Sequence, residues 1–311
     1  WKIKQVHAFT GFYYNENFKV FAILARRKGA KLVGHTHGAN NYIKLFYKRA
    51  NELYFLNYYT TYGVNKVDSD LQNIGGENVE FIPTGSTFFN LIPKWEKLSI
   101  NINKFTLLYA SGPLMEFSSD LLEISPEKNR IHRLKILQYI ENLLQKYPGL
   151  NISYKPFPGT YKNDPIKTRL SKWFDQSRIK LDYTSTIKMY SKVDIVLWDC
   201  ISTGFAESVV CGVPVLAFIA HHEYNLLSAR GKIVNDALKR DEVLCFDIDQ
   251  AEKYFQKIID HPPEYKKKTQ KTFQMFMDDN ATPVSPKEWR KRFFKAVQNS
   301  ERKRNNDIQK I

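Results

Sequence analysis

The 311-residue sequence contains few cysteines and no long hydrophobic run. Three cysteines are too few, and odd in number, for a disulfide framework, which favours a reduced, cytoplasmic compartment. No apolar segment is long enough to cross a bilayer, and because the first residues mix lysine and glutamine with apolar side chains, we expect no signal peptide among them. Because the chain begins with Trp1 rather than methionine, we expect it to be a piece of a longer protein.

Several common nucleotide and metal motifs are also missing. The sequence has no Walker A loop, no Gly-x-Gly-x-x-Gly fingerprint, no Cys-x-x-Cys pair and no nucleophile elbow. Their absence argues against a P-loop NTPase, a typical dehydrogenase, a zinc module and an α/β-hydrolase. Internal repeats and low-complexity tracts are not seen either.

Basic residues are in marked excess. The chain has 47 Lys and Arg against 32 Asp and Glu, a formal net charge of +15. This balance favours an anionic partner: a nucleotide, a nucleic acid or the anionic face of an inner membrane. Part of the excess is local, because residues 287–311 hold nine Lys or Arg and three acids.

The clearest pattern in the chain lies between Asp194 and Phe218. A buried strand, a polar turn, a short apolar helix and a second buried strand follow one another, and a glycine and a proline end the helix. The predicted ranges are 194–198, 199–204, 205–211 and 213–218. Such a βαβ unit with nearly continuous apolar strands predicts a parallel sheet that is covered on both faces.

The turn of this βαβ unit is predicted to bind phosphate. Ser202 or Thr203 would cap the helix beside Gly204, so that hydroxyls, backbone N–H groups and the positive end of the helix meet. Open α/β sheets bind ligands at this end of their strands. Glu207, one turn into the helix, would accept hydrogen bonds from a sugar hydroxyl. In the alternative interpretation the two hydroxyls only cap the helix and Glu207 only favours its N-terminus.

Two further predicted strand ends bring polar residues to the same sheet edge. Ser111 and Gly112 follow a strand at 105–109, and Lys155 ends a strand at 151–155. Lysine supplies a point charge for phosphate oxygens, and the charge that develops on a leaving phosphate needs such stabilisation. We therefore expect these residues to join the turn in binding a nucleotide donor. The alternative for Lys155 is a solvated lysine at a strand end.

His35 and His37 are the candidate catalytic residues of the N-terminal part. Their spacing suits two metal ligands on one strand face, but no nearby carboxylate or cysteine completes a site, so no metal is predicted. A neutral imidazole can instead take the proton of an acceptor hydroxyl, and His37, next to Gly38, is the better candidate. In the alternative interpretation both are hydrogen-bonded structural residues.

The predicted elements indicate an α/β fold with two Rossmann-like domains facing across a cleft. In the N-terminal part, strands at 31–35, 52–56 and 79–82 each precede a polar loop with a glycine, which indicates an incomplete domain. The predicted domains are an acceptor-side domain over 1–95, a donor-binding domain over 96–278 and a basic helical tail over 279–311.

Four short motifs carry a resemblance to known enzymes. They are Ser202-Thr203, the run Gly-Phe-Ala-Glu with the following Gly-Val-Pro, Phe157-Pro158, and the loop His37-Gly38-Ala39-Asn40. The second half of the chain resembles the nucleotide-binding domain of GT-B glycosyltransferases. More narrowly it is similar to bacterial surface-polysaccharide transferases with cytidine-nucleotide donors: Kdo transferases, sialyltransferase-like enzymes and CDP-glycerol glycerophosphotransferases. Those families have His-Pro where this chain has Phe157-Pro158, and Lys155 is the candidate to replace the missing charge.

The resemblance implies a glycosyltransferase that needs neither metal nor cofactor. Its expected partners are a nucleotide-sugar donor, with cytidine favoured, and a surface-polysaccharide, capsule or lipopolysaccharide acceptor. We expect it in the cytoplasm, with an anionic inner-membrane surface as a further candidate partner of the basic C-terminal helices, and we expect no nucleic acid. The alternatives are a CDP-glycerol-type glycerophosphotransferase, a nucleotide-sugar epimerase and a basic nucleic-acid-binding protein.

Overall fold

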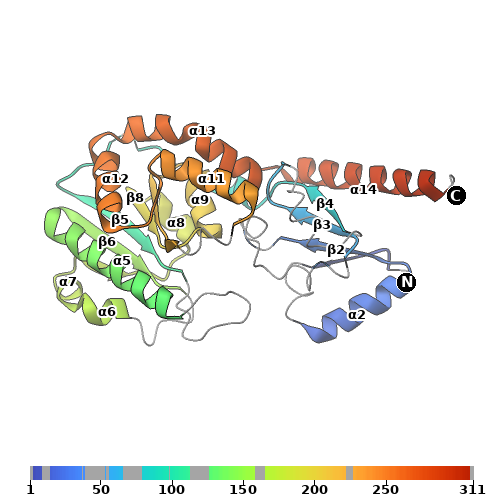
Figure 1. Ribbon diagram of the computed structural model, residues 1–311, viewed down its shortest axis with the longest axis horizontal. Coiled ribbons are helices and arrows are strands. Elements are labelled where there is room, and N and C mark those ends of the chain that lie inside the picture. The colour runs from blue at the N-terminus through green and yellow to red at the C-terminus, as the bar shows by residue number, and fades with distance from the viewer. Residues whose placement is uncertain are drawn as a thin grey trace. The chain divides into compact units, whose positions relative to one another are not determined.

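The chain folds into two compact α/β units. The computed structural model describes residues 3–8, 15–36, 38, 53, 56–65, 79–97, 99–112, 126–157, 165–221 and 227–308. The first unit comprises Trp1–Leu91 with Phe276–Ile311, and the second unit comprises Ile92–Met275. Each unit is built around one parallel sheet (Figure 1). These bounds differ from the predicted ones, because the segment predicted as a separate tail over 279–311 belongs to the first unit.

The first unit has a four-stranded parallel sheet in the order β1-β2-β3-β4. Its strands are β1 (Gln5–Ala8), β2 (Lys31–His35), β3 (Tyr58–Thr61) and β4 (Glu80–Pro83), with a short 3-10 helix at Phe89–Leu91. Strand β1 was not predicted. Strand β3 occupies a segment predicted as a loop, whereas the sequence pattern placed the strand at 52–56. Tyrosine and threonine favour strands, and all four residues of β3 are buried.

Helices cover both faces of this sheet. Helix α2 (Glu16–Arg27) buries Ala22 and Ala25 in a core cluster with Leu32 of β2. On the other face, α14 (Pro286–Ile308) packs Phe293 and Val297 against the residues at 33, 58 and 82 (Figure 1). The basic C-terminal helix is therefore a structural layer of the first unit, with its apolar stripe turned to the sheet.

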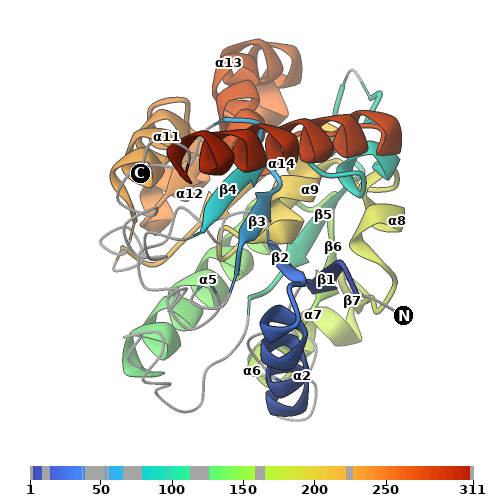
Figure 2. The same ribbon diagram turned by 90° about the vertical axis from the view of Figure 1, so that its right-hand side faces the viewer.

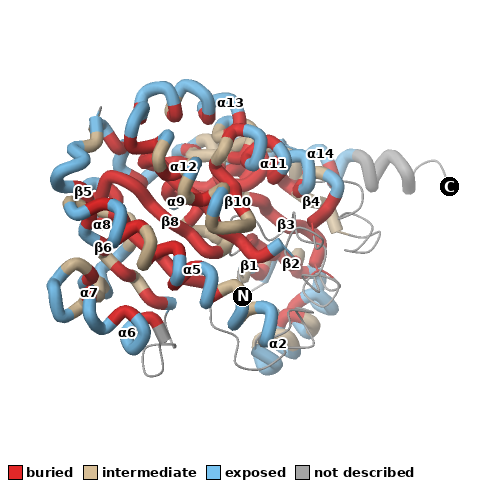
Figure 3. Tube along the Cα trace, turned by 60° about the vertical axis from the view of Figure 1, so that its left-hand side comes forward, coloured by how far each residue is buried: buried red, intermediate tan, exposed pale blue. Residues whose placement is uncertain are grey.

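The second unit has a six-stranded parallel sheet in the order β10-β9-β8-β5-β6-β7. Its strands are β5 (Phe105–Ala110), β6 (Leu150–Lys155), β7 (Ile179–Leu181), β8 (Ile195–Trp198), β9 (Val215–Phe218) and β10 (Leu244–Cys245). Read from β7, this is the Rossmann strand order 3-2-1-4-5-6, whose topological switch point lies between β5 and β8. Every residue of β8 (Figure 3) and every residue of β9 is buried, as the continuous apolar runs predicted.

Helices lie on both sides of the second sheet. They are α5 (Pro126–Lys146), α6 (Pro165–Arg169), α7 (Ser171–Asp175), α8 (Thr186–Tyr190), α9 (Thr203–Cys211), α11 (Ala229–Arg240), α12 (Ile248–Asp260) and α13 (Pro262–Asn280). Figure 2 shows α5 and α12 on one side of the sheet and α8 and α9 on the other. Tyr139 of α5 packs edge-on against Phe218 of β9 and Phe255 of α12, which places the core beneath α5 and α12. Helix α11 was not predicted.

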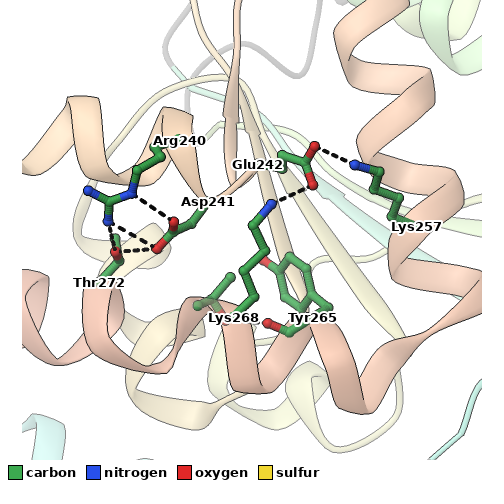
Figure 4. A network of polar contacts seen from close by, with 8 residues as sticks. Arg240, Asp241, Glu242, Lys257, Tyr265, Lys268 and Thr272 are labelled. Carbon is green, nitrogen blue, oxygen red and sulfur yellow. Dashed lines mark hydrogen bonds and ion pairs between the residues drawn. The ribbon is translucent and has the colours of Figure 1, made fainter.

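A polar network joins the turn after α11 to α12 and α13. Figure 4 shows two carboxylates of this turn, Asp241 and Glu242, with their partners. Thr272 donates a hydrogen bond to Asp241 at 2.5 Å, and Lys257 and Lys268 form ion pairs with Glu242 at 2.5 and 2.7 Å. These contacts fix α13 against the body of the second unit. None of the helices in the described part of the chain has the length and apolar character needed to span a membrane.

Candidate functional site

The residues that follow three neighbouring strands line one cavity in the second unit. Strands β5, β6 and β8 end beside a cavity of about 300 Å³, which the first turn of α9 also lines; we call it the α9 cavity. Its lining includes every residue predicted to bind the donor: Ser111, Gly112, Lys155, Ser202, Thr203, Gly204 and Glu207. It lies at the switch point between β5 and β8, where doubly wound sheets bind their ligands.

Ser202 stands at the N-cap position of α9 without capping the helix. Its side chain makes no capping hydrogen bond, and the residue lines the α9 cavity. The same residue type caps α11, where the Ser228 hydroxyl accepts a hydrogen bond from the Gly231 amide at 3.0 Å. At the start of α12, Asp247 accepts from the Gln250 amide at 2.8 Å. The interpretation in which Ser202 serves only as a cap therefore does not describe this helix.

Gly204 is required by close packing at the start of α9. A Cβ atom at this position would overlap the Trp198 indole ring, which lies at the end of β8. The ring is fixed in turn, because its Nε1 donates a hydrogen bond to the Ser208 hydroxyl at 2.9 Å. The first turn of α9 thus rests directly on the ring, and the backbone at Gly204 lines the α9 cavity.

Glu207 is a buried carboxylate with one oxygen already bound. Its Oε2 accepts hydrogen bonds from the Thr186 hydroxyl at 2.9 Å and from the Tyr190 hydroxyl at 3.1 Å. Burial raises the pKa of Glu207, while the two hydroxyl groups and the charge of Lys155 act in the opposite direction. No described residue donates a hydrogen bond to Oε1, and Glu207 lines the α9 cavity. Oε1 is therefore placed to accept a hydrogen bond from a bound hydroxyl group.

Lys155 and Ser111 connect the loops around the α9 cavity. Lys155 is half-buried, and its Nζ donates to the Thr184 carbonyl oxygen at 2.5 Å. The Ser111 hydroxyl accepts a hydrogen bond from the Phe157 amide at 3.0 Å, which ties the end of β5 to the loop after β6. Lys155 retains further donors for a phosphate, because an ammonium group has three, whereas Ser111 mainly positions its neighbours.

A buried ion pair beside the α9 cavity was not predicted. Arg133 and Asp199 pair at 2.5 Å, and their side chains are 7% and 3% exposed. Asp199 also accepts hydrogen bonds from the Tyr109 hydroxyl at 2.9 Å and from the Gly112 amide at 2.5 Å, while Arg133 donates to the Gly112 carbonyl at 3.1 Å. Burial disfavours the guanidinium charge, but Asp199 together with Tyr109 and Tyr154 outweighs this effect and raises the pKa of Arg133. The pair therefore holds both polar groups of the Gly112 backbone.

A second cavity, of about 550 Å³, lies at the carboxyl edge of the first sheet; we call it the first-unit cavity. His35 lines it, and both of its ring nitrogens are engaged: Nδ1 lies 2.7 Å from the Thr60 hydroxyl and Nε2 lies 2.9 Å from Nδ1 of His7. Burial, with a smaller effect of His7, lowers the pKa of His35 to about 4. Such a ring is a weak base, which favours the structural alternative for His35. His37 lies outside the described residues.

Sequence reasoning missed His7 because it missed β1. Burial lowers the pKa of His7 as well, and the two rings stack with their centroids 5.1 Å apart. Within the described ranges, no group of three or more His, Cys, Asp or Glu residues is arranged to hold a metal ion. The first-unit cavity therefore presents neutral imidazoles at physiological pH.

Comparison with known proteins identifies the family. The family model described as "LIC12162 family transferase" matches residues 1–293. The chain belongs to the LIC12162 transferase family. The expectation of an enzyme that transfers a chemical group is thereby confirmed. No curated protein matches the sequence of this family member.

Solved structures similar to this LIC12162 family member share its two-domain fold. A putative UDP-N-acetylglucosamine 2-epimerase from Listeria monocytogenes has a TM-score of 0.57 at 13% identity, over 96% of this chain and 74% of that chain. Anabaena Alr3699/HepE in complex with UDP-glucose gives 0.56 at 12% identity, over 95% and 79%. A mutant of S. aureus TarM in complex with fondaparinux, alpha-GlcNAc-glycerol and UDP gives 0.50 at 14% identity, over 86% and 50%. These similarities confirm the predicted GT-B fold with two Rossmann-like domains.

Proposed function

We propose that this transferase is a glycosyltransferase that binds a nucleotide sugar in the α9 cavity, with a phosphate group at the start of α9. The observation that carries the proposal is the Ser202 hydroxyl, which stands at a helix N-terminus and does not cap it. Thr203 and Lys155 line the same cavity. Hydroxyl donors, a lysine and the positive end of a helix together match a phosphate group.

Four of the lining residues have distinct parts in the proposed reaction. Ser202 and Thr203 donate hydrogen bonds to phosphate oxygens, Lys155 supplies a positive charge, and Oε1 of Glu207 accepts a hydrogen bond from a ribose or sugar hydroxyl. Sugar transfer forms a bond between an acceptor hydroxyl oxygen and the anomeric carbon, with loss of the hydroxyl proton, and breaks the bond between that carbon and a phosphate oxygen. Negative charge therefore grows on the leaving nucleotide. Fixed donors around that oxygen lower the barrier because they need no reorganisation during the reaction.

The nucleobase of the donor is proposed from the motif resemblance and from the ligands of the similar solved structures. Cytidine is the first candidate because Ser202-Thr203 resembles the motif of transferases that use cytidine nucleotides. Uridine is the second, because the HepE and TarM structures contain UDP-glucose and UDP. The proposed acceptor is a surface polysaccharide or lipopolysaccharide. The proposed reaction requires neither metal nor cofactor. We place the enzyme at the cytoplasmic face of the inner membrane, which the basic C-terminal helices would contact.

The first experiment is a calorimetric titration of the protein with CMP, CDP, UDP and GDP. One nucleotide class is expected to bind, and Ser202→Ala and Thr203→Ala are expected to weaken its binding. If none of the four binds at millimolar concentration, or if both variants bind like the wild type, the proposed site is wrong.

The second experiment incubates the protein with the sugar nucleotide of that class, with and without glycan acceptors. Transfer of sugar to the acceptor supports the proposal. Conversion of the donor in the absence of any acceptor would instead identify a nucleotide-sugar epimerase. Incubation with CDP-glycerol distinguishes the remaining enzyme class, since an acceptor product that has gained glycerol phosphate would identify a glycerophosphotransferase.

A further inference from the structure

An aromatic wall from α14 lines the first-unit cavity. Trp289 contributes this wall, and its indole stacks on Phe293 with the ring centroids 5.3 Å apart and the planes inclined by 11°. Phe293 is 1% exposed and belongs to the core of the first unit, so the indole is held in place. A flat, fixed aromatic ring that is partly open to a cavity matches the apolar C–H face of a sugar ring.

Hydroxyl groups lie around the same cavity. Thr60 lines it at the end of β3, and its hydroxyl is oriented by the 2.7 Å contact with His35. Ser86 and Thr87 line it after β4, where Gly85 adopts a φ of +76° that places them past the strand end. An aromatic wall with several hydroxyl groups is the composition expected of a site for a sugar, whose own hydroxyls need such partners.

Arg290 gives this cavity its charge. The side chain lines the cavity, is exposed, and forms no ion pair with any residue of the described part of the chain. The nearest acid along α14, Glu288, is paired with Arg292 at 2.9 Å. No Asp or Glu is found among the described residues that line the cavity. Because burial keeps His35 neutral, Arg290 is the cationic group that these described residues present to a ligand.

We propose that the first-unit cavity binds the acceptor, and that the acceptor sugar carries an anionic group, a carboxylate or a phosphate, that pairs with Arg290. A guanidinium group binds either anion through two parallel hydrogen bonds. The sugar ring lies against Trp289, and its hydroxyls bond to Thr60 and Ser86. This inference rests on the proposed function and adds the chemical class of the acceptor to it.

The test compares two substitutions that remove the same charge from the same helix. Arg290→Gln removes the guanidinium of the cavity, and Arg292→Gln removes one that does not line the cavity and is paired with Glu288. Binding is measured by calorimetry with three probes: a glucuronate-terminated disaccharide, the same disaccharide with its carboxylate methyl-esterified, and a disaccharide bearing a terminal sugar 6-phosphate. Nucleotide binding by each variant is measured in parallel.

The expected result is that at least one anionic probe binds at least about tenfold more tightly than the neutral ester, and that Arg290→Gln removes this preference. The probe that binds better distinguishes a carboxylate from a phosphate acceptor. Arg292→Gln should behave like the wild type. In turnover with the anionic acceptor, Arg290→Gln should raise KM for the acceptor and leave kcat nearly unchanged.

Two failures are distinguishable. If a nucleotide binds and depends on Ser202, but the neutral ester binds as well as the anionic probes, or Arg290→Gln changes nothing, then the inference about the acceptor is wrong and the proposed function stands. If no nucleotide binds, the proposed function itself fails. If Arg290→Gln and Arg292→Gln lose the same amount of affinity for the anionic probes, the effect comes from the general charge of α14, and the inference is also overturned.

Discussion

Two serines at helix starts form a matched pair of substitutions that tests the phosphate site. Ser202 stands at the N-cap of α9 without a capping hydrogen bond, whereas Ser228 caps α11 through the Gly231 amide at 3.0 Å. Ser202→Ala should therefore change the free energy of unfolding by less than about 0.5 kcal/mol. Ser228→Ala should lower it by about 0.5–2 kcal/mol, the usual effect of removing a cap.

For nucleotide affinity the order of the two variants should be reversed, with a large effect of Ser202→Ala and none of Ser228→Ala. A hydrogen bond to a charged phosphate contributes about 1.5–3 kcal/mol, so Ser202→Ala should raise the Kd of the nucleotide roughly 10- to 150-fold. Ser228 does not line the α9 cavity, and Ser228→Ala should leave this Kd at the wild-type value. The two variants thus distinguish a hydroxyl group that stabilises the folded protein from one that binds a ligand.

Urea unfolding followed by circular dichroism gives the free energy of unfolding of each variant, and isothermal titration calorimetry with the best-binding nucleotide gives the nucleotide Kd. The reasoning is refuted if Ser202→Ala destabilises the protein as much as Ser228→Ala does and leaves the nucleotide Kd unchanged. Ser202 would then be an ordinary cap, and the cavity at α9 would not be the phosphate site.

Three other substitutions test the start of α9, the packing of α13 and the buried histidine of the first-unit cavity. Gly204→Ala forces a methyl group into the Trp198 ring, so it should destabilise the protein by about 1–3 kcal/mol in urea unfolding and weaken nucleotide binding in calorimetry. Tyr265→Phe removes a 2.6 Å hydrogen bond to the Val215 carbonyl and should lower the free energy of unfolding by about 0.5–1.5 kcal/mol, with no change in nucleotide Kd. The folded-state pKa of His35, about 4, lies below the ordinary value of 6.5, so the unfolded chain takes up its proton first. Stability should therefore fall as the pH drops from 6.5 to 4, by up to about 1.4 kcal/mol per pH unit, and His35→Gln should flatten this slope in urea titrations.

The second sheet could be predicted well from the sequence. Its central strands include short apolar runs bounded by glycine, proline or polar residues, and the runs predicted at 194–198 and 213–218 contain the observed β8 and β9. In a parallel sheet the carboxyl ends of all strands lie at one edge, so predicting the strands also predicted which residues meet there. That is why Lys155 and Ser202, far apart in the chain, were both assigned to the cavity that they line.

The first sheet was predicted less well, for a physical reason that β3 illustrates. Its sequence, Tyr-Tyr-Thr-Thr, carries four hydroxyl groups, and that composition was interpreted as a loop. The rings of Tyr58 and Tyr59 are nevertheless 0% and 1% exposed, because the sheet has a core on each face. Hydroxyl groups do not prevent burial when their partners come from other strands, as Thr60 shows with His35. Those partners are set by tertiary packing, which a local pattern does not contain.

The ion pair of Arg133 and Asp199 could not be predicted for a related reason. The two residues are 66 positions apart, and each looks like an ordinary surface charge in its own segment. The signal available in the sequence was weaker: an aspartate directly after a fully apolar strand must be paired if it is buried. Helix α11 was missed because its many charges hide a short stripe at Val234, Ala237 and Leu238, which are all buried.

The arrangement around the α9 cavity indicates a site whose geometry is fixed before a ligand arrives. The Gly112 backbone is held at both its N–H and its C=O by Arg133 and Asp199, and the start of α9 rests on the ring of Trp198. A buried ion pair contributes little net stability, because desolvation offsets its attraction. Its position next to a cavity therefore points to a role in orienting backbone groups rather than in holding the fold together. Donors fixed in this way act most strongly on a charge that develops during a reaction, which is what transfer from a phosphate requires.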